Sequence, residues 1–438
     1  MKLSASLLLA IAFFFALPGA ADAARLWSSG CELQAGSAGN MTDDLEFGAE
    51  GTDAGSQQVS TSIFRSGLAS CRMIRSTDGQ ANGKVQWSTT NVATDLYFRM
   101  YLYIATMPTE SAAILYFWDQ GIDGTEGGVR LNSGGTLSFV DDEGDVIATG
   151  ATVLSTATWY RIEFGYDAAT DYEIRINGST EVSGGAHDGD NVESFIIGLC
   201  VGTSANNCGA DAAGQGDLYF DDMALNDTSG SAQTSWPGAG SIVNMQPDAA
   251  GDNTGCSAGT YADVDEVTPD DVTTYCNLDL DTGGDIFDVN MESSSTAGID
   301  SYDTITLVHT GYREAKASAA SAALTPRVKS ASGGTTSSGT SVAGSNTVYS
   351  TNGVVFTFFP RGYQLVSYTD PTTAAAWTPT GTNSLDNMQV GINCTDCNPD
   401  ARVSTLFAVV EYNDGSPPAP SAATFDSIIW FRDESSDF

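Results

Sequence analysis

Short runs in which apolar and polar residues alternate recur along most of this chain of 438 residues. In residues 95–106 every second residue is apolar, and the residues between them are mostly Tyr and Arg. A period of two is typical of β-strands with one face buried, whereas no stretch sustains apolar residues at helical spacing. The 47 glycines supply turns between such strands. The sequence therefore predicts an all-β protein built from packed sheets.

Turn signals divide the chain. We predict one β domain over residues 24–227. Its strands fold back at 141–144, at 167–171 and at the Asn177-Gly178 turn, and its last strands are expected at 195–201 and 218–225. A Ser/Gly/Thr-rich stretch with Trp236-Pro237-Gly238 predicts a linker at 228–240. A second β-sandwich domain is expected over 241–438, with strands at 305–308, 354–359, 364–368, 388–392, 403–412 and 428–431, and one short helix or strand before a loop within 316–350.

The first residues have the pattern of a secretory signal peptide, 1–23. Lys2 supplies the positive start, 7–17 is almost wholly apolar, and Ala21-Asp22-Ala23 fits a cleavage site. We expect a secreted, extracellular protein, with the periplasm as the alternative. No later apolar run is long enough for a membrane span, so no membrane insertion is expected.

Eight cysteines follow the predicted cleavage site, an even number that indicates disulfides in an oxidising compartment. Sequence alone leaves every pairing open, and pairing nearest neighbours keeps each bridge inside one predicted domain. Those pairs are Cys31–Cys71, Cys200–Cys208, Cys256–Cys276 and Cys394–Cys397.

The net charge limits which classes of partner the protein can bind. The chain holds 55 acidic and 17 basic residues, a net charge of −38. Nucleic acids are bound through Lys and Arg, so this composition excludes a nucleic-acid footprint and also disfavours anionic membranes. Cations, neutral glycans and basic partners stay admissible. The oligomeric state is left open.

Three segments, taken in order, resemble a known family. They are Trp159-Tyr160-Arg161-Ile162-Glu163-Phe164, then Tyr172-Glu173-Ile174-Arg175-Ile176-Asn177-Gly178, and then Leu218-Tyr219-Phe220-Asp221-Asp222-Met223-Ala224-Leu225. The set resembles the laminin-G-like, concanavalin A-like jelly-roll domain over about residues 25–227. The resemblance implies a two-sheet jelly-roll sandwich that binds glycans or proteins, sometimes with Ca²⁺, and is sometimes elaborated into glycanases. The second half resembles β modules of uncharacterised phage-type and environmental surface proteins.

The same resemblance implies a structural calcium ion. In similar carbohydrate-binding modules an early acid and an Asp of the closing strand meet at Ca²⁺, and the matching positions are Glu32 and Asp221 or Asp222. Since neighbouring residues face opposite sides of a strand, at least one of the two Asp points towards a sheet interface and needs a partner. The alternative is that this Asp caps a turn or accepts backbone N–H bonds.

A glycan site needs an aromatic ring beside polar side chains. Trp118, Asp119 and Asp123 offer that combination in one loop, although Trp118 at the end of an apolar run also fits a core position. The Tyr97, Tyr101 and Tyr103 row is the alternative platform, equally explained as a buried strand face.

Catalysis is weakly supported. The chain has two histidines, and no E-x-D-x-x-E string of a jelly-roll glycanase occurs. We therefore expect a secreted, non-enzymatic binding protein that recognises a glycan or a surface protein. The alternatives are a structural subunit of a cell-surface or virion assembly, and a polysaccharide-degrading enzyme such as a glycoside hydrolase or polysaccharide lyase.

Overall fold

The computed structural model describes residues 24–34, 46, 49–50, 57–76, 83–88, 95–119, 124–167, 170–187, 192–201, 215–266, 274–279, 285–316, 323–343, 359–395, 397 and 401–415. The predicted signal peptide and the predicted strand at 428–431 lie outside these residues, as does most of the strand predicted at 354–359.

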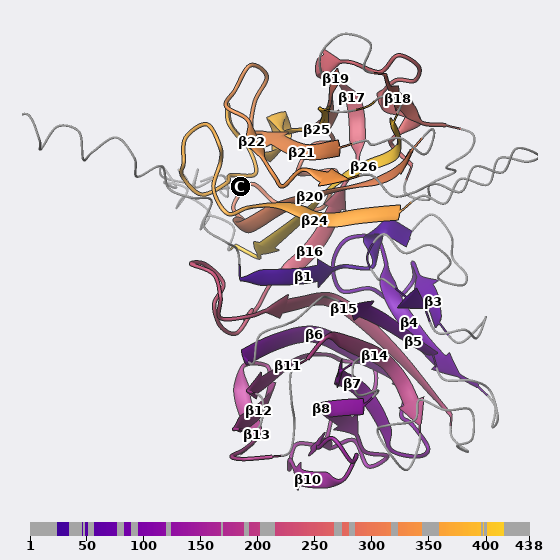
Figure 1. The fold of residues 1–438 in the computed structure, drawn as a ribbon. Coiled ribbons are helices and arrows are strands. Elements are labelled where there is room, and N and C mark those ends of the chain that lie inside the picture. Colours follow the sequence, from indigo (N-terminus) through magenta and orange to yellow (C-terminus); the bar gives the residue numbers. More distant parts are fainter. Residues whose placement is uncertain are drawn as a thin grey trace, which may run out of the picture.

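Strands of the first half form two antiparallel sheets (Figure 1). Sheet A runs in the order β13 (Ser179–Gly184), β12 (Asp171–Ile176), β11 (Trp159–Asp167), β6 (Asp95–Thr106), β15 (Gly216–Asn226), β4 (Ser70–Arg75) and β3 (Gln57–Ser60), with β1 (Arg25–Ser29) paired to β15. Sheet B runs β10 (Val146–Thr149), β9 (Leu137–Val140), β8 (Gly124–Leu131), β7 (Ala112–Asp119), β14 (Ser194–Val201), β5 (Gly83–Ser88) and β2 (Ala49–Glu50).

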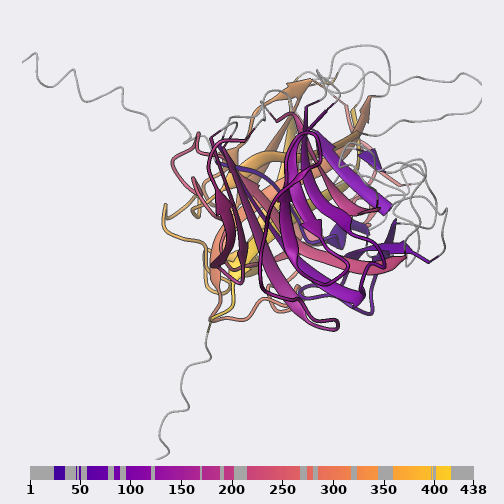
Figure 2. The ribbon, with the colours of Figure 1, turned by 90° about the horizontal axis from the view of Figure 1, so that it is seen from below.

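The two sheets enclose an apolar core, so this half is called the N-terminal sandwich. Figure 2 shows its two curved layers from below. The alternate residues of β6 from Leu96 to Ile104 are fully buried and meet apolar side chains of β7 and β14. Trp27 and Phe98 pack edge-on against Phe195, with ring centroids 4.8 and 5.1 Å apart. The period of two in the sequence thus becomes one buried and one outward face of each strand.

The predicted turns are present in the N-terminal sandwich. β9 and β10 are joined across 141–145, and β11 and β12 across 168–170. Between β12 and β13, Asn177 and Gly178 both have positive φ, 53° and 84°. This is the backbone that a two-residue hairpin of matching twist requires, and Asn-Gly adopts it at the lowest cost.

The second half forms two further antiparallel sheets. Sheet C contains β16 (Ser241–Met245), β26 (Ala401–Asn413), β20 (Thr304–Lys316) and β24 (Phe359–Ser367), with β18 (Cys276–Leu278) paired to β26. Sheet D contains β17 (Pro247–Thr254), β19 (Asp285–Met291), β25 (Gln389–Cys394), β21 (Ala323–Lys329) and β22 (Ser337–Ser338), with β23 (Val342–Ala343) paired to β21. A separate apolar cluster fills the space between them, and we call this half the C-terminal sandwich.

The predicted all-β fold class is confirmed. Helical structure in the described residues is confined to short 3₁₀ turns, η1 (Glu32–Gln34), η2 (Tyr261–Asp263) and η3 (Leu385–Asn387). The Ala/Ser-rich region 316–350, where one short element was expected, supplies β21 to β23. None of the helices in the described part of the chain is long and apolar enough to cross a membrane.

Disulfides join the predicted neighbours in three cases: Cys31–Cys71, Cys256–Cys276 and Cys394–Cys397. Cys200 is also disulfide-bonded, while Cys208, its predicted partner, lies outside the described residues. Such bonds persist in oxidising compartments, so they fit an extracellular protein.

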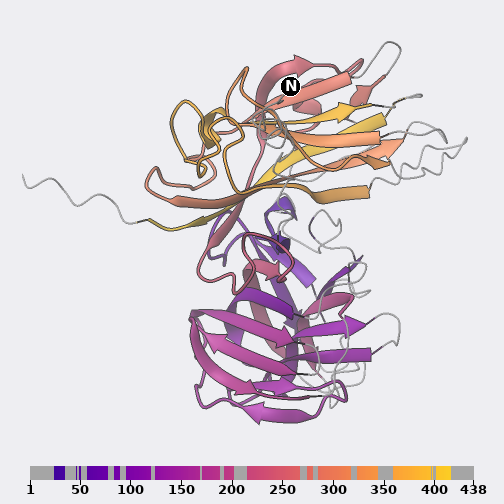
Figure 3. The ribbon, with the colours of Figure 1, turned by 60° about the vertical axis from the view of Figure 1, so that its left-hand side comes forward.

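The two sandwiches are stacked on each other through β1, β15 and β16 (Figures 1 and 3). A small apolar cluster lies at the junction, made of Leu33, Ala224, Ile242, Phe407 and Val409. Beside it, Glu411 of β26 binds two buried arginines of the N-terminal sandwich. Its carboxylate contacts Arg25 Nη1, and it lies 2.7 Å from Arg99 Nη1.

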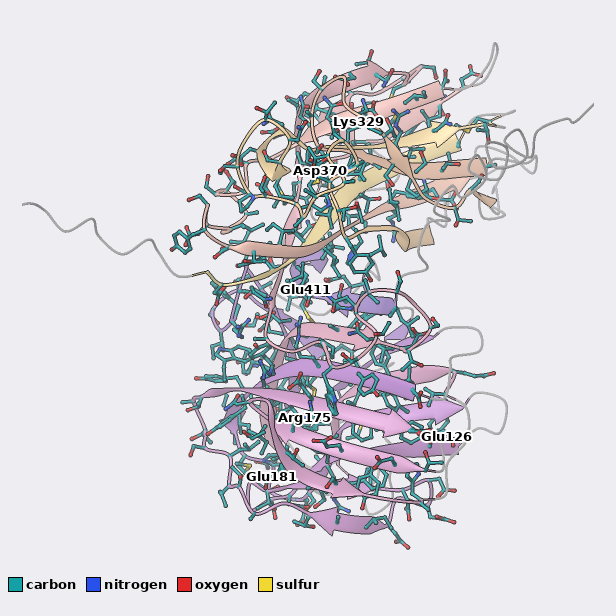
Figure 4. All side chains as sticks on the ribbon, turned by 90° about the vertical axis from the view of Figure 1, so that its left-hand side faces the viewer. Glu126, Arg175, Glu181, Lys329, Asp370 and Glu411 are labelled. Carbon is teal, nitrogen blue, oxygen red and sulfur yellow. A yellow bond between two sulfur atoms is a disulfide. The ribbon has the colours of Figure 1, made fainter. Side chains whose placement is uncertain are left out.

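Burial alone would raise the pKa of Glu411, but Arg25 and Arg99 outweigh it and hold that pKa below its usual value. The junction is therefore both apolar and ionic, which fixes the two sandwiches against each other more firmly than a flexible linker would. Figure 4 shows Glu411 between the two bodies.

Candidate functional site

The outward face of sheet A carries the tyrosine row of β6. Tyr101 is buried beneath the guanidinium of Arg65, which lies 3.6 Å from its ring centroid. Tyr103 packs between Trp159 and Tyr219, at 5.3 and 5.8 Å. These two rings are therefore occupied by protein side chains.

Tyr97, the first ring of that row, meets a residue from the segment that joins the two sandwiches. Trp236 lies 5.2 Å from Tyr97 between ring centroids. One edge of its ring also lies so close to β11 that a Cβ added at Gly165 would come within 2.7 Å of it. A glycine at position 165 is thus what allows the indole to rest on the sheet.

Arg175 of β12 lies over the Trp236 ring, with its guanidinium carbon 3.7 Å from the ring centroid. This distance is typical of a cation–π contact. Arg175 also donates to Glu173, at 2.8 and 3.1 Å, and the interaction lowers the pKa of Glu173. Figure 4 shows Arg175 on the strands of sheet A.

The segment that carries Trp236 is held to the N-terminal sandwich by several hydrogen bonds. Gly238 N–H donates to Glu163 Oε1 at 3.0 Å, and Asn226 Nδ2 donates to Ser235 O at 2.6 Å. The predicted linker therefore forms part of the sheet A surface.

An open pocket lies beside these rings. It is lined by Tyr97, Gly165, Tyr166, Asp167, Asp171, Tyr172, Glu173 and Trp236. The cavity volume is about 120 Å³, smaller than that of most small-ligand sites, so the pocket would hold part of a ligand rather than enclose a whole one. One strand register builds it, because Tyr97, Gly165 and Glu173 are directly opposite one another on β6, β11 and β12.

Two residues further along the same register, three aspartates stand in a row. Asp167 pairs with Asp95 on one side and with Asp171 on the other. Burial, the charge of Asp167 and a side-chain hydrogen bond to Asp167 raise the pKa of Asp95. Burial and the charges of Asp95 and Asp167 also raise the pKa of Tyr97.

This geometry suits the recognition of a polyhydroxylated or cationic small group. Aromatic rings present flat apolar area, and carboxylate oxygens accept hydrogen bonds without donating any. The pocket is open, so a terminal or protruding group of a larger molecule can enter it.

The ligand residues predicted from sequence are on the other sheet. Trp118 is half-buried at the end of β7 in sheet B and packs against a small cluster with Tyr116, at 6.5 Å between ring centroids. Asp119 ends the same strand, and its side chain is outside the described part of the structure, as is the whole of Asp123. The structure thus places Trp118 partly in a packed cluster and tests neither aspartate.

The predicted calcium ligands do come together, and all three are buried. Hydrogen-bond donors point at their oxygens. Glu32 accepts from the N–H groups of Leu68 and Ala69, at 2.9 and 3.1 Å. Asp221 accepts from Arg65 N–H at 2.7 Å.

Asp222 also has its oxygens occupied by donors. It accepts from Ile242 N–H at 2.6 Å and contacts the Arg65 guanidinium. Donors are what a carboxylate needs when no cation is present, so the contacts match the backbone-bonded alternative better than a calcium shell.

Negative charge is nevertheless in excess at this cluster. Burial raises the pKa of Glu32 and of Asp221 well above the usual values. Burial also raises the pKa of the neighbouring Glu46 to about 7, although hydrogen bonds from the Ser29 hydroxyl and from the N–H groups of residues 31–33 act to lower it. Calcium at Glu32, Asp221 and Asp222 stays a prediction. A second acidic group, Asp141, Asp142 and Glu143 in the β9–β10 turn, has oxygens close enough together to hold a metal ion.

Of the eight residues that line the pocket, only Tyr97 was a candidate binding residue in the sequence. Two of the others carried a signal that could have been used. Trp236 was assigned to a linker, although a lone Trp in a Ser/Gly/Thr stretch is an available signal of docking. Gly165 interrupts the bulky residues of β11, and a glycine inside a strand often marks the close approach of another group. Tyr97 was predicted, as one member of the alternative platform.

No protein-family model matches the chain, and no curated protein matches its sequence. Among solved structures it is similar to a sialidase, at 12% identity and a TM-score of 0.31 over 40% of this chain and 16% of the sialidase.

It is also similar to the carbohydrate-binding module CBM66 from Bacillus subtilis and to the alginate lyase Aly36B. The module gives 11% identity and a TM-score of 0.27 over 36% of this chain and 86% of the module. The lyase gives 12% and 0.34 over 46% of this chain and 97% of the lyase. At such identities and TM-scores the likeness carries no conclusion about function.

Proposed function

We propose that the protein is an exported, non-enzymatic binding protein that recognises a glycan through the pocket beside Tyr97 and Trp236. The observation that carries the proposal is the combination of two half-buried aromatic rings with carboxylates in one open pocket. A sugar ring places its C–H face against an aromatic side chain, while its hydroxyls donate to carboxylate oxygens. The resemblance of residues 25–227 to laminin-G-like domains also supports a glycan-binding function.

Glycosidases hold two carboxyl groups at least about 5 Å apart, with the glycosidic bond between them. The carboxylates of the pocket, Asp167, Asp171 and Glu173, stand on one sheet face, and Glu173 is paired with Arg175. The proposal therefore assigns them to hydrogen bonding with the ligand rather than to catalysis. The C-terminal sandwich then serves to attach or space the binding domain, and its junction also positions the segment that carries Trp236.

A glycan array, run with Ca²⁺ and with EDTA, tests the proposal. We expect binding to at least one glycan, and equal signals in Ca²⁺ and EDTA if any calcium ion is only structural and tightly held. Trp236→Ala should weaken binding about tenfold or more, because a central aromatic residue supplies a large share of binding energy. Trp159→Ala is the matched control, since Trp159 packs on a tyrosine of the same sheet face outside the pocket.

The Trp118→Ala variant distinguishes binding at the pocket from binding at the site on sheet B that the sequence predicts. If Trp118→Ala abolishes binding and Trp236→Ala does not, the ligand lies on sheet B and the pocket is not the site. No glycan signal from the wild-type protein under either condition would remove the proposal's main support.

A further inference from the structure

The acidic side chains on the outward face of sheet A fall into two groups. Glu163, Glu173 and Asp217 each contact an arginine, at 3.1, 2.8 and 2.7 Å respectively. Asp95, Asp167 and Asp171 form no ion pair with an arginine or lysine in the described part of the structure. Two of these three acids, Asp167 and Asp171, line the pocket, and Asp95 is directly opposite Asp167 on the next strand.

Their arrangement is costly for the free protein. Asp167 is directly opposite Asp95 and Asp171 on its two neighbouring strands, and like charges directly opposite each other destabilise a sheet. The eight residues described as lining the pocket include no Lys or Arg, and Glu173 is already paired with Arg175. A positive charge brought by a ligand would offset this repulsion.

From this geometry we propose that the pocket recognises an amino sugar, a glycan unit that carries an ammonium group, as in glucosamine. The inference rests on the proposed glycan-binding function and names its ligand class. The ammonium binds at the edge formed by Asp167 and Asp171, and the sugar ring lies against Tyr97 and Trp236. Acidic sugars are repelled by the same carboxylates.

The wall of the pocket favours an amino sugar over a lysine side chain. Tyr97 and Trp236, with their rings tilted by 57° to each other, form an apolar wall next to Asp167 and Asp171. A rigid ring with an ammonium and hydroxyls can use both parts at once, whereas a lysine offers one ammonium on a flexible stem that loses more conformational freedom on binding.

Calorimetry on the full chain tests the inference with a glucosamine tetramer and an N-acetylglucosamine tetramer. The wild-type protein should bind the glucosamine tetramer about tenfold or more tightly, because charged hydrogen bonds are stronger than neutral ones and acetylation removes the charge. Added salt should reduce the difference in affinity between the two tetramers. Asp167→Asn should abolish the preference, while Glu110→Gln, which changes an exposed acid of the same sandwich away from the pocket, should keep it.

Asp167→Asn also has a stability readout. Because it removes a like-charge contact, its melting temperature should equal or exceed that of the wild type. If Asp167→Asn loses the preference for the glucosamine tetramer but keeps its stability, Asp167 contacts the ligand. Loss of the preference with a clearly lower melting temperature would contradict the repulsive arrangement on which the inference stands.

The remaining outcomes separate this inference from the proposed function. Equal binding of both tetramers, lost in Trp236→Ala, would overturn the amino sugar and leave glycan binding standing. Absence of binding to these tetramers and to every glycan on the array would overturn both. Equally tight binding of tetralysine, or binding of CaCl₂ that Asp167→Asn abolishes, would replace the amino sugar by a basic peptide or a metal ion.

Discussion

The outward faces of sheets A and D both collect acidic residues, but sheet A leaves a group of three of them without a basic partner in the described structure. On sheet D, Lys329 Nζ lies 2.8 Å from both Asp252 and Asp288, and Arg327 lies 3.1 Å from Asp288. On sheet A, Asp95, Asp167 and Asp171 are directly opposite one another on adjacent strands, and Asp167 and Asp171 line the pocket. Charges compensated within the protein stabilise its structure, whereas uncompensated charges at an open pocket are available to a ligand.

The pKa values follow the same division. Burial acts to raise the pKa of Asp252, but the Gly333 N–H and Lys329 outweigh it and hold that pKa far below its usual value. At the pocket, burial and Asp167 raise the pKa of Asp95. Stability experiments can therefore test which acidic groups the fold has neutralised.

The largest effect is expected at the junction of the sandwiches. Glu411→Leu leaves Arg25 and Arg99 buried without their carboxylate and should cost about 3–5 kcal/mol of unfolding free energy. Denaturant titration measures it. Glu173→Gln, which breaks a half-exposed ion pair, should cost less than about 1 kcal/mol. Similar losses in both variants would show that the buried ions contribute no more than a surface pair.

The Glu411 pair also predicts a pH dependence. Because its folded pKa lies below the usual 4.5, its contribution is present above pH 4.5 and is lost as pH falls through the folded value. Wild-type stability should decrease in that acidic range, and this part of the decrease should be absent in Glu411→Leu.

On sheet D, Lys329→Met should cost about 3 kcal/mol, since it removes a buried cation from two aspartates. Lys329→Arg keeps the charge and should cost less. If Lys329→Met is as stable as Asp167→Asn, the proposed difference between compensated acids on sheet D and uncompensated acids on sheet A is wrong.

Glu46 is an acid that the fold buries without a basic partner in the described contacts. Its pKa rises from 4.5 to about 7 on folding, so the wild type loses stability as pH rises between these values. Glu46→Gln should then gain on the order of 3 kcal/mol at pH 8 and little at pH 4. Thermal unfolding at both pH values measures the difference, and an equal effect at both would exclude ionisation as the cause.

The smallest effect concerns the glycine beneath Trp236. Gly165→Ala should displace the indole and weaken ligand binding about tenfold, because the added Cβ would come within 2.7 Å of its ring. Trp236 fluorescence and ligand affinity should change together. Unchanged affinity with a shifted fluorescence spectrum would show that the ring does not contact the ligand.

Alternation along β6 and the Asn177-Gly178 turn determined most of the fold, because strand period and turn chemistry are local properties. Three of the four cysteine pairs followed from joining nearest neighbours, which keeps each bridge inside one domain. The family resemblance also implied that Glu32 meets Asp221 or Asp222, but not the Arg65 and N–H donors that surround them.

What only the tertiary structure decided is the pocket. Trp236 is 71 residues from Gly165 along the chain, and it reaches β11 only because the joining segment folds back over sheet A. Asp95 and Asp171 are 76 residues apart and become neighbours of Asp167 only through strand order and register. Sequence alone determined an acidic, disulfide-bearing all-β chain, because composition and periodicity are read residue by residue. Which acids remain uncompensated depends on long-range strand pairing, and that is set by the packing of the whole chain.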